Sequence, residues 1–206
     1  MAARIINHKL YIKEVNTRKE KEYIAKNWMT DDSSIRIARI LDGKEDYHIA
    51  MNHVLEEISK VIHPERLYIY ETDQKTISRT FEWCAKGVKS QIDTMQKLDY
   101  KTYMGVWENN LSNSTSIVID DIEKYKKSDN VLYNTLKRQG IKRIIDVPFY
   151  IDGELKGYIG ADNYEINEIV DTKLLLETVS FFIGSRVANH YFKKLSKRDR
   201  HRHSKL

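Results

Sequence analysis

The segment from residue 143 to 162 constrains the fold most. Its two halves, 143–151 and 154–162, are rich in β-branched and aromatic side chains, and the dipeptide Asp152-Gly153 separates them. Such side chains favour extended strands. An Asp-Gly pair favours a type I′ turn, whose twist matches that of two antiparallel strands. The segment therefore predicts a β-hairpin.

A second hairpin is expected earlier in the chain. Residues 66–71 and 76–84 have the same β-branched and aromatic character, and they flank the polar segment Asp73-Gln74-Lys75. Residues 116–119 form a shorter run of this kind. Each sheet must bury an apolar face against another element, so these strands and the helices around them predict an α+β domain.

Apolar residues recur at helical spacing in the remainder of the chain. Before the last hairpin we expect helices at residues 11–29, 35–43, 44–62, 101–111 and 131–139. After it, a long helix is expected from Glu168 to about Lys197. At about 1.5 Å per residue this helix would run roughly 45 Å, which is more than one small domain needs.

The positive charge of the chain is concentrated in its tail. Residues 193–206 hold seven Lys or Arg against Asp199 alone, and the net charge of the whole chain is +5. A nearly neutral body lacks an extended phosphate-binding face, so we expect no specific nucleic-acid partner. The sequence has neither an apolar run long enough to span a bilayer nor the apolar block of a signal peptide. We therefore expect a cytoplasmic protein without membrane insertion.

The sequence offers little for catalysis. Cys84 is the only cysteine, which excludes an internal disulfide and a cysteine-rich zinc site. Its position between Trp83 and Ala85 is typical of a small buried hydrophobe. Asp120 and Asp121 are adjacent, and adjacent strand residues point to opposite faces, so the two carboxyl groups would not share a proton. No histidines have the spacing of a helical zinc pair. We expect no enzymatic activity and no metal.

The order of the elements, together with several short strings, resembles a GAF domain. The similarity is to the GAF domains attached to bacterial diguanylate cyclases (GGDEF proteins), and it extends over about residues 46–195. The strings lie at residues 81–88, 91–93, 139–142, 147–148 and 157–163. The resemblance implies a PAS-like fold with a central six-stranded antiparallel sheet, helices packed on one face, and long N- and C-terminal helices. It divides the chain into an N-terminal helical segment (1–45), the GAF domain (46–195) and a basic flexible tail (196–206).

The resemblance also implies a sensory role. The domain would bind an unidentified small molecule and pass the signal to a cyclic-di-GMP-type output domain, whose GGDEF or EAL motif this chain lacks. The alternative is a ligand-free dimerisation module whose pocket is filled by its own side chains. GAF pockets lie between the sheet and a helical insert, and the pocket candidates, some of which could serve in core packing instead, are Trp83, Cys84, Tyr103, Trp107, Asp120, Arg143 and Phe149.

The resemblance guides the expected cofactors and partners as well. Bilin-binding GAF domains typically carry a Cys-His pair at a different place, so we expect neither a bilin nor haem, and the cyclic-nucleotide signature of phosphodiesterase GAF domains is absent. The long terminal helix carries apolar residues beyond the expected edge of the domain. They favour a partner helix and hence a homodimer, and the candidate interface residues are Phe182, Ile183, Val187 and Tyr191.

Overall fold

The computed structural model describes residues 32–105, 107, 111, 113, 116–166 and 171–203. The predicted helix at residues 11–29 lies outside these residues, and so does the start of the last helix that was predicted at Glu168. In the described part of the chain, no helix is both long and apolar enough to cross a membrane.

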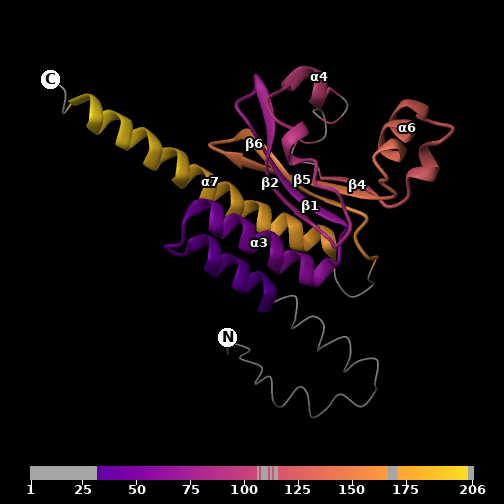
Figure 1. Ribbon diagram of the computed structural model, residues 1–206, viewed down its shortest axis with the longest axis horizontal. Helices are drawn as coiled ribbons and strands as arrows, with labels where there is room; N and C mark the ends of the chain where they lie inside the picture. Colours follow the sequence, from indigo (N-terminus) through magenta and orange to yellow (C-terminus); the bar gives the residue numbers. More distant parts are fainter. Residues whose placement is uncertain are drawn as a thin grey trace, which may run out of the picture.

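A six-stranded antiparallel sheet forms the centre of the molecule (Figure 1). Its strands lie in the order β3-β2-β1-β6-β5-β4. Their bounds are β1 Arg66–Thr72, β2 Thr76–Cys84, β3 Leu98–Asp99, β4 Ile117–Ile119, β5 Ile144–Ile151 and β6 Glu154–Asp162. Both predicted hairpins and the predicted short strand are present. The two-residue strand β3 has too little sequence pattern to be predicted from residue types.

The β5–β6 hairpin closes at the predicted turn. Asp152 and Gly153 have φ angles of 53° and 78°, the left-handed values that both central residues of a type I′ turn require. β6 then pairs with β1 on its other side, so the two hairpins share one continuous sheet.

A bulge in β2 changes which side chains face which side of the sheet. Ile69 pairs with Phe81, but the next residue of β1, Tyr70, pairs with Arg79, so Thr80 is the extra residue. Because a bulge interrupts the two-residue alternation of a strand, Arg79 and Phe81 lie on opposite faces although they are two residues apart.

One face of the sheet is covered by α3 (Tyr47–Ile62), α7 (Thr172–His203) and a helix over residues 32–42. Figure 1 shows α3 and α7 side by side under the sheet. The main core lies here, and its largest fully buried side chains include Met51, Leu55, Ile58, Leu67, Ile69 and Phe149. Ile37 and Leu41 belong to the same core, so the compact unit begins before the predicted boundary at residue 46.

The opposite face is covered only in part. The elements beside it are the 3-10 helices η1 (Ile92–Thr94) and η2 (Ile122–Tyr125), and the helices α4 (Tyr100–Met104) and α6 (Asn130–Arg138). The expectation that helices pack on one face only is therefore corrected, because α4 and α6 bury a second cluster that includes Tyr70, Met104 and Leu136. The helix predicted for residues 101–111 is also shorter than expected, since α4 ends at Met104.

The helix α7 is longer than the sheet that it covers. It has 32 residues, which corresponds to roughly 48 Å of helix, and its buried positions end at Val187. Figure 1 shows its C-terminal part extending away from the sheet. The tail predicted to be flexible from residue 196 is instead helical as far as His203.

Candidate ligand-binding site

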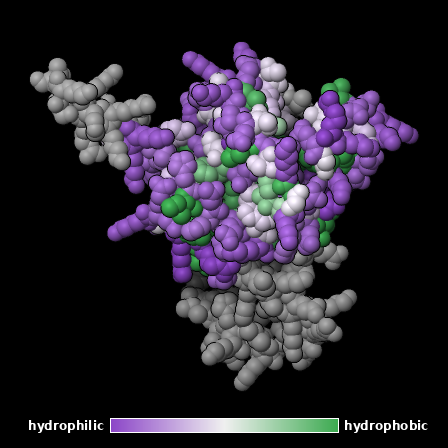
Figure 2. Space-filling model, in the orientation of Figure 1, coloured by the Kyte–Doolittle hydropathy of each residue, from purple (hydrophilic) through white to green (hydrophobic). Residues whose placement is uncertain are grey.

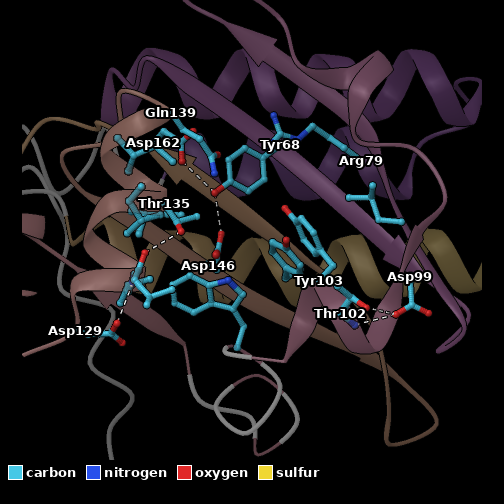
Figure 3. Close-up of a pocket in the computed structure, with 18 residues that line it drawn as sticks. Tyr68, Arg79, Asp99, Thr102, Tyr103, Asp129, Thr135, Gln139, Asp146 and Asp162 are labelled. Carbon is cyan, nitrogen blue, oxygen red and sulfur yellow. Dashed lines mark hydrogen bonds between the residues drawn. The ribbon is translucent and has the colours of Figure 1, made fainter.

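A cavity of about 680 Å³ lies between the second face of the sheet and the helices α4 and α6. Its volume falls in the range of ligand-binding pockets, roughly 300 to 1,000 Å³. Figure 3 shows its residues converging from the sheet and from both helices. The polar and aromatic side chains that line it are Tyr68, Arg79, Asp99, Thr102, Tyr103, Trp107, Asp129, Thr135, Gln139, Asp146, Tyr158 and Asp162.

The floor of the cavity depends on one glycine. Tyr68 of β1 and Asp146 of β5 both pair with Gly160 of β6, so the three residues form one row across the sheet. A Cβ atom at Gly160 would lie 2.1 Å from the Tyr68 ring and 2.2 Å from Oδ1 of Asp146. Because Gly160 has no side chain, the Tyr68 ring crosses the row, and its hydroxyl donates a 3.0 Å hydrogen bond to Asp146.

The Tyr68 hydroxyl lies between two carboxyl groups. It is 3.0 Å from Oδ1 of Asp146 and 3.1 Å from Oδ1 of Asp162 (Figure 3). Asp162 also receives a 2.9 Å hydrogen bond from Nη1 of Arg66. Both aspartates are 3% exposed or less. Buried carboxyl groups are rare in strands unless they are paired, so this cluster is a feature that the core alone does not require.

Arg79 crosses the cavity above the Tyr68 ring. Its guanidinium carbon is 4.4 Å from the centre of that ring, within the range of a cation–π contact. Its Nε donates to the hydroxyl of Tyr70 at 3.1 Å, and its Nη1 forms an ion pair with Glu82. Glu82 in turn lies 3.3 Å from Nε of Arg66. The two arginines are therefore both committed to partners within the protein.

The pKa values of the three acids in this cluster shift in different directions: those of Asp146 and Asp162 are raised, and that of Glu82 is lowered. Burial, with the neighbouring charge of Asp162 as the second cause, raises the pKa of Asp146 to about 8. Burial also raises the pKa of Asp162, although Arg66 opposes it. Burial acts in the same sense on Glu82, but hydrogen bonds from Ser90 and Arg79 outweigh it and lower the pKa of that carboxyl. Asp146 is thus largely protonated at neutral pH, and Glu82 is ionised.

Aromatic side chains form one wall of the cavity. The rings of Tyr70 and Tyr158 stack with their centres 4.8 Å apart, and the hydroxyl of Tyr103 donates to that of Tyr70 at 2.8 Å. Tyr103 and Trp107 continue this wall from α4 and the segment after it. The wall is apolar over its rings and polar only at its hydroxyl groups, as is usual for small-molecule sites.

Two aspartates lie where α4 and α6 begin. Asp99 accepts a hydrogen bond from the backbone N–H of Thr102, and Asp129 accepts one from that of Leu132, each at 2.9 Å. These are N-cap contacts, which explains why the sequence has Asp at the start of each helix. Since both residues also line the cavity, they add negative charge to its rim.

The architecture matches solved GAF domains, although the sequences have diverged. The phycoerythrobilin-bound GAF domain of a cyanobacterial phytochrome is 11% identical with a TM-score of 0.64, and the match covers 80% of this chain and 99% of that one. The GAF domain of A. aeolicus nlh2 in an inactive state is 14% identical with a TM-score of 0.60, over 80% and 99% of the two chains. This chain has the GAF fold. Neither a protein-family model nor a curated protein matches the sequence.

The expectation that the chain takes no bilin is wrong, because solved structures that share its fold contain bilins. A third GAF structure, the far-red absorbing dark state of a protein with bound biliverdin, is 15% identical with a TM-score of 0.61, and the match covers 75% of this chain and 97% of that one. Solved structures similar to this GAF fold thus contain biliverdin or phycoerythrobilin. The absence of the expected Cys-His pair is therefore not sufficient to exclude a bilin.

Two of the residues predicted for the pocket line the cavity, and two lie on the other face of the sheet. Tyr103 and Trp107 are cavity residues. Trp83 instead packs against the main core, because the bulge at Thr80 turns the last part of β2 over. Phe149 is 2% exposed and belongs to that core too, on the α7 side of the sheet.

The three other predicted pocket residues lie outside the cavity. Cys84 is at the end of β2 beside Arg66 and Glu82, and burial raises the pKa of its thiol. Asp120 is exposed and forms a 2.7 Å ion pair with Lys124. Arg143 donates to the backbone carbonyl of Tyr164 at 2.9 Å. Asp120 and Arg143 line a separate hollow beside η2.

The residues predicted for the dimer interface also require correction. Ile183 and Val187 are fully buried in the chain's own core, so they are not available to a partner helix. Phe182 packs partly against the same core. Tyr191 is half-exposed, and its hydroxyl donates to Glu71 at 3.0 Å. The exposed apolar residues of α7 lie on a different stripe, at Leu174, Phe181 and Phe192.

The buried pair Asp146 and Asp162 at the floor of the cavity was not predicted, but the sequence contains a pattern that indicates it. Asp146 is the one charged residue of β5, and Asp162 ends β6 directly after the uncharged run 157–161. Strand residues two apart share a face, so Asp162 lies on the same face as Tyr158. A carboxyl group that shares a buried face with aromatic side chains indicates a site. The pairing of strands that joins Asp146 to Tyr68 could not be read from local sequence.

Proposed function

We propose that this chain is a sensory GAF domain that binds a small molecule in the cavity between its sheet and α4 and α6. The observation that carries this proposal is the cavity of about 680 Å³ with a buried Asp146 at its floor. The GAF structures with bound biliverdin and phycoerythrobilin support it, since they share the fold. We assign no catalytic role to the domain.

A ligand-free interaction module is the second candidate. Such a module would fill the space between sheet and insert with its own side chains. The size of the cavity favours the sensory alternative, because a void of this size lined by charged and hydroxyl groups has polar groups available to a ligand.

The signal would leave through α7. Phe181 is 72% exposed and Phe192 62%, and they lie 7 and 18 residues after Leu174, which places all three side chains on one stripe of the helix. In the view of Figure 2, hydrophilic residues dominate the described surface, so exposed phenylalanines on one helix stripe are unusual. We propose that this stripe pairs with a second copy of the chain and passes the signal to a cyclic-di-GMP-type output domain.

The two tryptophans on opposite faces of the sheet provide an internal test of ligand binding. Trp107 lines the cavity and Trp83 packs against the main core. In the variant with Trp28→Phe and Trp83→Phe, a cavity ligand should change the emission of Trp107. In the variant with Trp28→Phe and Trp107→Phe, the emission of Trp83 should stay constant.

Biliverdin and a panel of small metabolites are the compounds to titrate. A true ligand should also raise the thermal midpoint, by about 2.7 kcal/mol of added stability at one hundred times its dissociation constant. If no compound changes the Trp107 emission or the midpoint, the interaction module becomes the better account. Equal changes at both tryptophans would place the binding outside the cavity.

A further inference from the structure

Among the buried ionisable groups beside the cavity, one carboxyl group has no ion-pair partner among the described residues. Arg66 is paired with Asp162 and Glu82, and Arg79 is paired with Glu82. These two cations and two anions balance one another. Asp146 is the fifth ionisable group of the cluster, and none of the described cations forms an ion pair with it.

Asp146 also has hydrogen-bonding capacity to spare. An ionised carboxylate can accept about four hydrogen bonds. Among the described residues, the Tyr68 hydroxyl is the one donor within hydrogen-bond distance of Asp146, and it contacts Oδ1. Asp146 is only 3% exposed, and it still lines the cavity. Its remaining oxygen is therefore accessible to a ligand in the cavity and to little else.

The walls around Asp146 suit a cation. The π faces of tyrosine and tryptophan attract positive charge, and Tyr68, Tyr103, Trp107 and Tyr158 all line the cavity. We propose that the cavity binds a small organic cation, with an amine or a protonated ring nitrogen on Asp146 and an apolar body against the aromatic wall. This inference rests on the proposed function and names the class of its ligand.

The rim favours the same charge. Asp99 and Asp129 add two carboxylates to the lining, and Arg79, the cation that lines the cavity, is committed to Glu82. An anionic ligand would meet the carboxylates of Asp99 and Asp129 without a free cation among the described lining residues, so carboxylates and phosphates are disfavoured.

Binding of a cation should release a proton. The groups that face Asp146 are Tyr68 from β1, Arg79 from β2, Tyr103 from α4, and Asp162 and Tyr158 from β6. In this setting the pKa of Asp146 is raised to about 8. A cation favours the ionised carboxylate, so binding below that pH must displace the proton. Between pH 6 and pH 7 the affinity for a cation should rise roughly ninefold, and above about pH 9 the ionisation of Asp146 should change it no further.

Three probes of similar size and different charge test the proposal: 2-phenylethylamine, 2-phenylethanol and phenylacetate. Isothermal titration calorimetry at pH 7 in phosphate and in the zwitterionic buffer ACES, whose ionisation enthalpies differ, gives both the affinity and the number of protons released. We expect the amine to bind at least about tenfold more tightly than the alcohol, with roughly 0.9 proton released, and phenylacetate to bind most weakly.

Two matched variants separate the floor from the rim. Asp146→Asn keeps the shape and the acceptor for Tyr68, and it should abolish both the amine preference and the proton release. Asp129→Asn removes a rim charge but keeps a good N-cap for α6, and it should leave the proton release intact. Circular dichroism and the thermal midpoint establish that each variant is folded.

Several results would overturn the proposal. They are equal affinity for amine and alcohol, tighter binding of phenylacetate, an amine preference that survives Asp146→Asn, or no binding of any probe at about 10 mM, well above a weak 1 mM dissociation constant. If biliverdin or another compound that is not a cation changes the emission of Trp107 while the amine does not bind, the sensory function stands and the assigned ligand class falls.

Discussion

Gly160 and Asp146 illustrate how single residues decide the chemistry of this GAF fold. The missing side chain at Gly160 gives Tyr68 a path to Asp146, and the pair forms the floor of the cavity. Burial then holds the pKa of Asp146 far above that of an exposed aspartate. One glycine in a strand thus allows the contact between Tyr68 and Asp146 that forms the floor of the cavity.

Gly160→Ala should damage this floor. Its Cβ would lie about as close to the Tyr68 ring as to Asp146, at 2.1 and 2.2 Å, and both neighbours lie on paired strands that cannot move apart easily. We expect a loss of about 1–3 kcal/mol in the free energy of unfolding, as in other overpacked cores, and loss of ligand binding. Gly105→Ala is the control, since Gly105 has an ordinary helical φ of −49°. Urea unfolding of both variants tests this, and equal stability of the two would contradict it.

Asp146 should make stability depend on pH in an unusual direction. Its pKa is about 8 in the folded protein against an ordinary value of 3.8 for aspartate, so between these values the folded state binds more protons than the unfolded state. The free energy of unfolding should therefore fall as pH rises from 5 to 7, by on the order of 1 kcal/mol per unit from this group. Urea unfolding at several pH values should show a shallower fall in Asp146→Asn. Parallel curves for the two proteins would rule this role out.

At the scale of elements, local signals predicted the hairpins and tertiary contacts decided the rest. The Asp152-Gly153 turn specifies its hairpin within a few residues, and the structure has both turn residues in left-handed geometry. The bulge at Thr80 depends instead on how β2 pairs with β1. Without it, regular alternation would place Trp83 on the same face as Arg79, whereas in the structure Trp83 packs against the main core.

The bulge makes a test by deletion possible. Without Thr80, Arg79 and Phe81 become neighbours and keep their opposite faces, so the deletion should leave a folded protein with a modest loss of stability. Without Ser78, Ile77 would turn away from its buried position, at a cost of about 2 kcal/mol or more. Thermal unfolding compares the two deletions. Equal damage from both would mean that the bulge does not set the faces of β2.

At the scale of the whole molecule, the sheet separates the main hydrophobic core from the cavity. The α3 and α7 side holds the closely packed core, and the α4 and α6 side holds the cavity. Sequence periodicity predicted that α7 is long, but it could not distinguish the stripe that faces the sheet from the stripe that faces outward. Ile183 and Val187 were therefore assigned to a dimer interface although they complete the core.

The exposed stripe of Leu174, Phe181 and Phe192 on α7 leads to a specific prediction about assembly. We expect a homodimer in solution, and the double variant Phe181→Glu, Phe192→Glu should be a monomer with an unchanged thermal midpoint, because both side chains are exposed. Val187→Glu should instead lower the midpoint, since it buries a charge in the core. Light scattering over a concentration series measures the mass. A wild-type monomer at tens of micromolar, well above a dimer constant of about 1 µM, would remove this route for the signal.

The central claim is that the cavity, and no other part of the described surface, holds the ligand. Thr135 projects into it from α6 (Figure 3), so Thr135→Trp should fill it, whereas Thr135→Val keeps its size. Native mass spectrometry after equilibration with the small-molecule fraction of a bacterial extract tests this directly. We expect the wild type and Thr135→Val to retain a noncovalently bound metabolite that Thr135→Trp lacks. Identical spectra for the wild type and Thr135→Trp, with or without a bound mass, would contradict the claim.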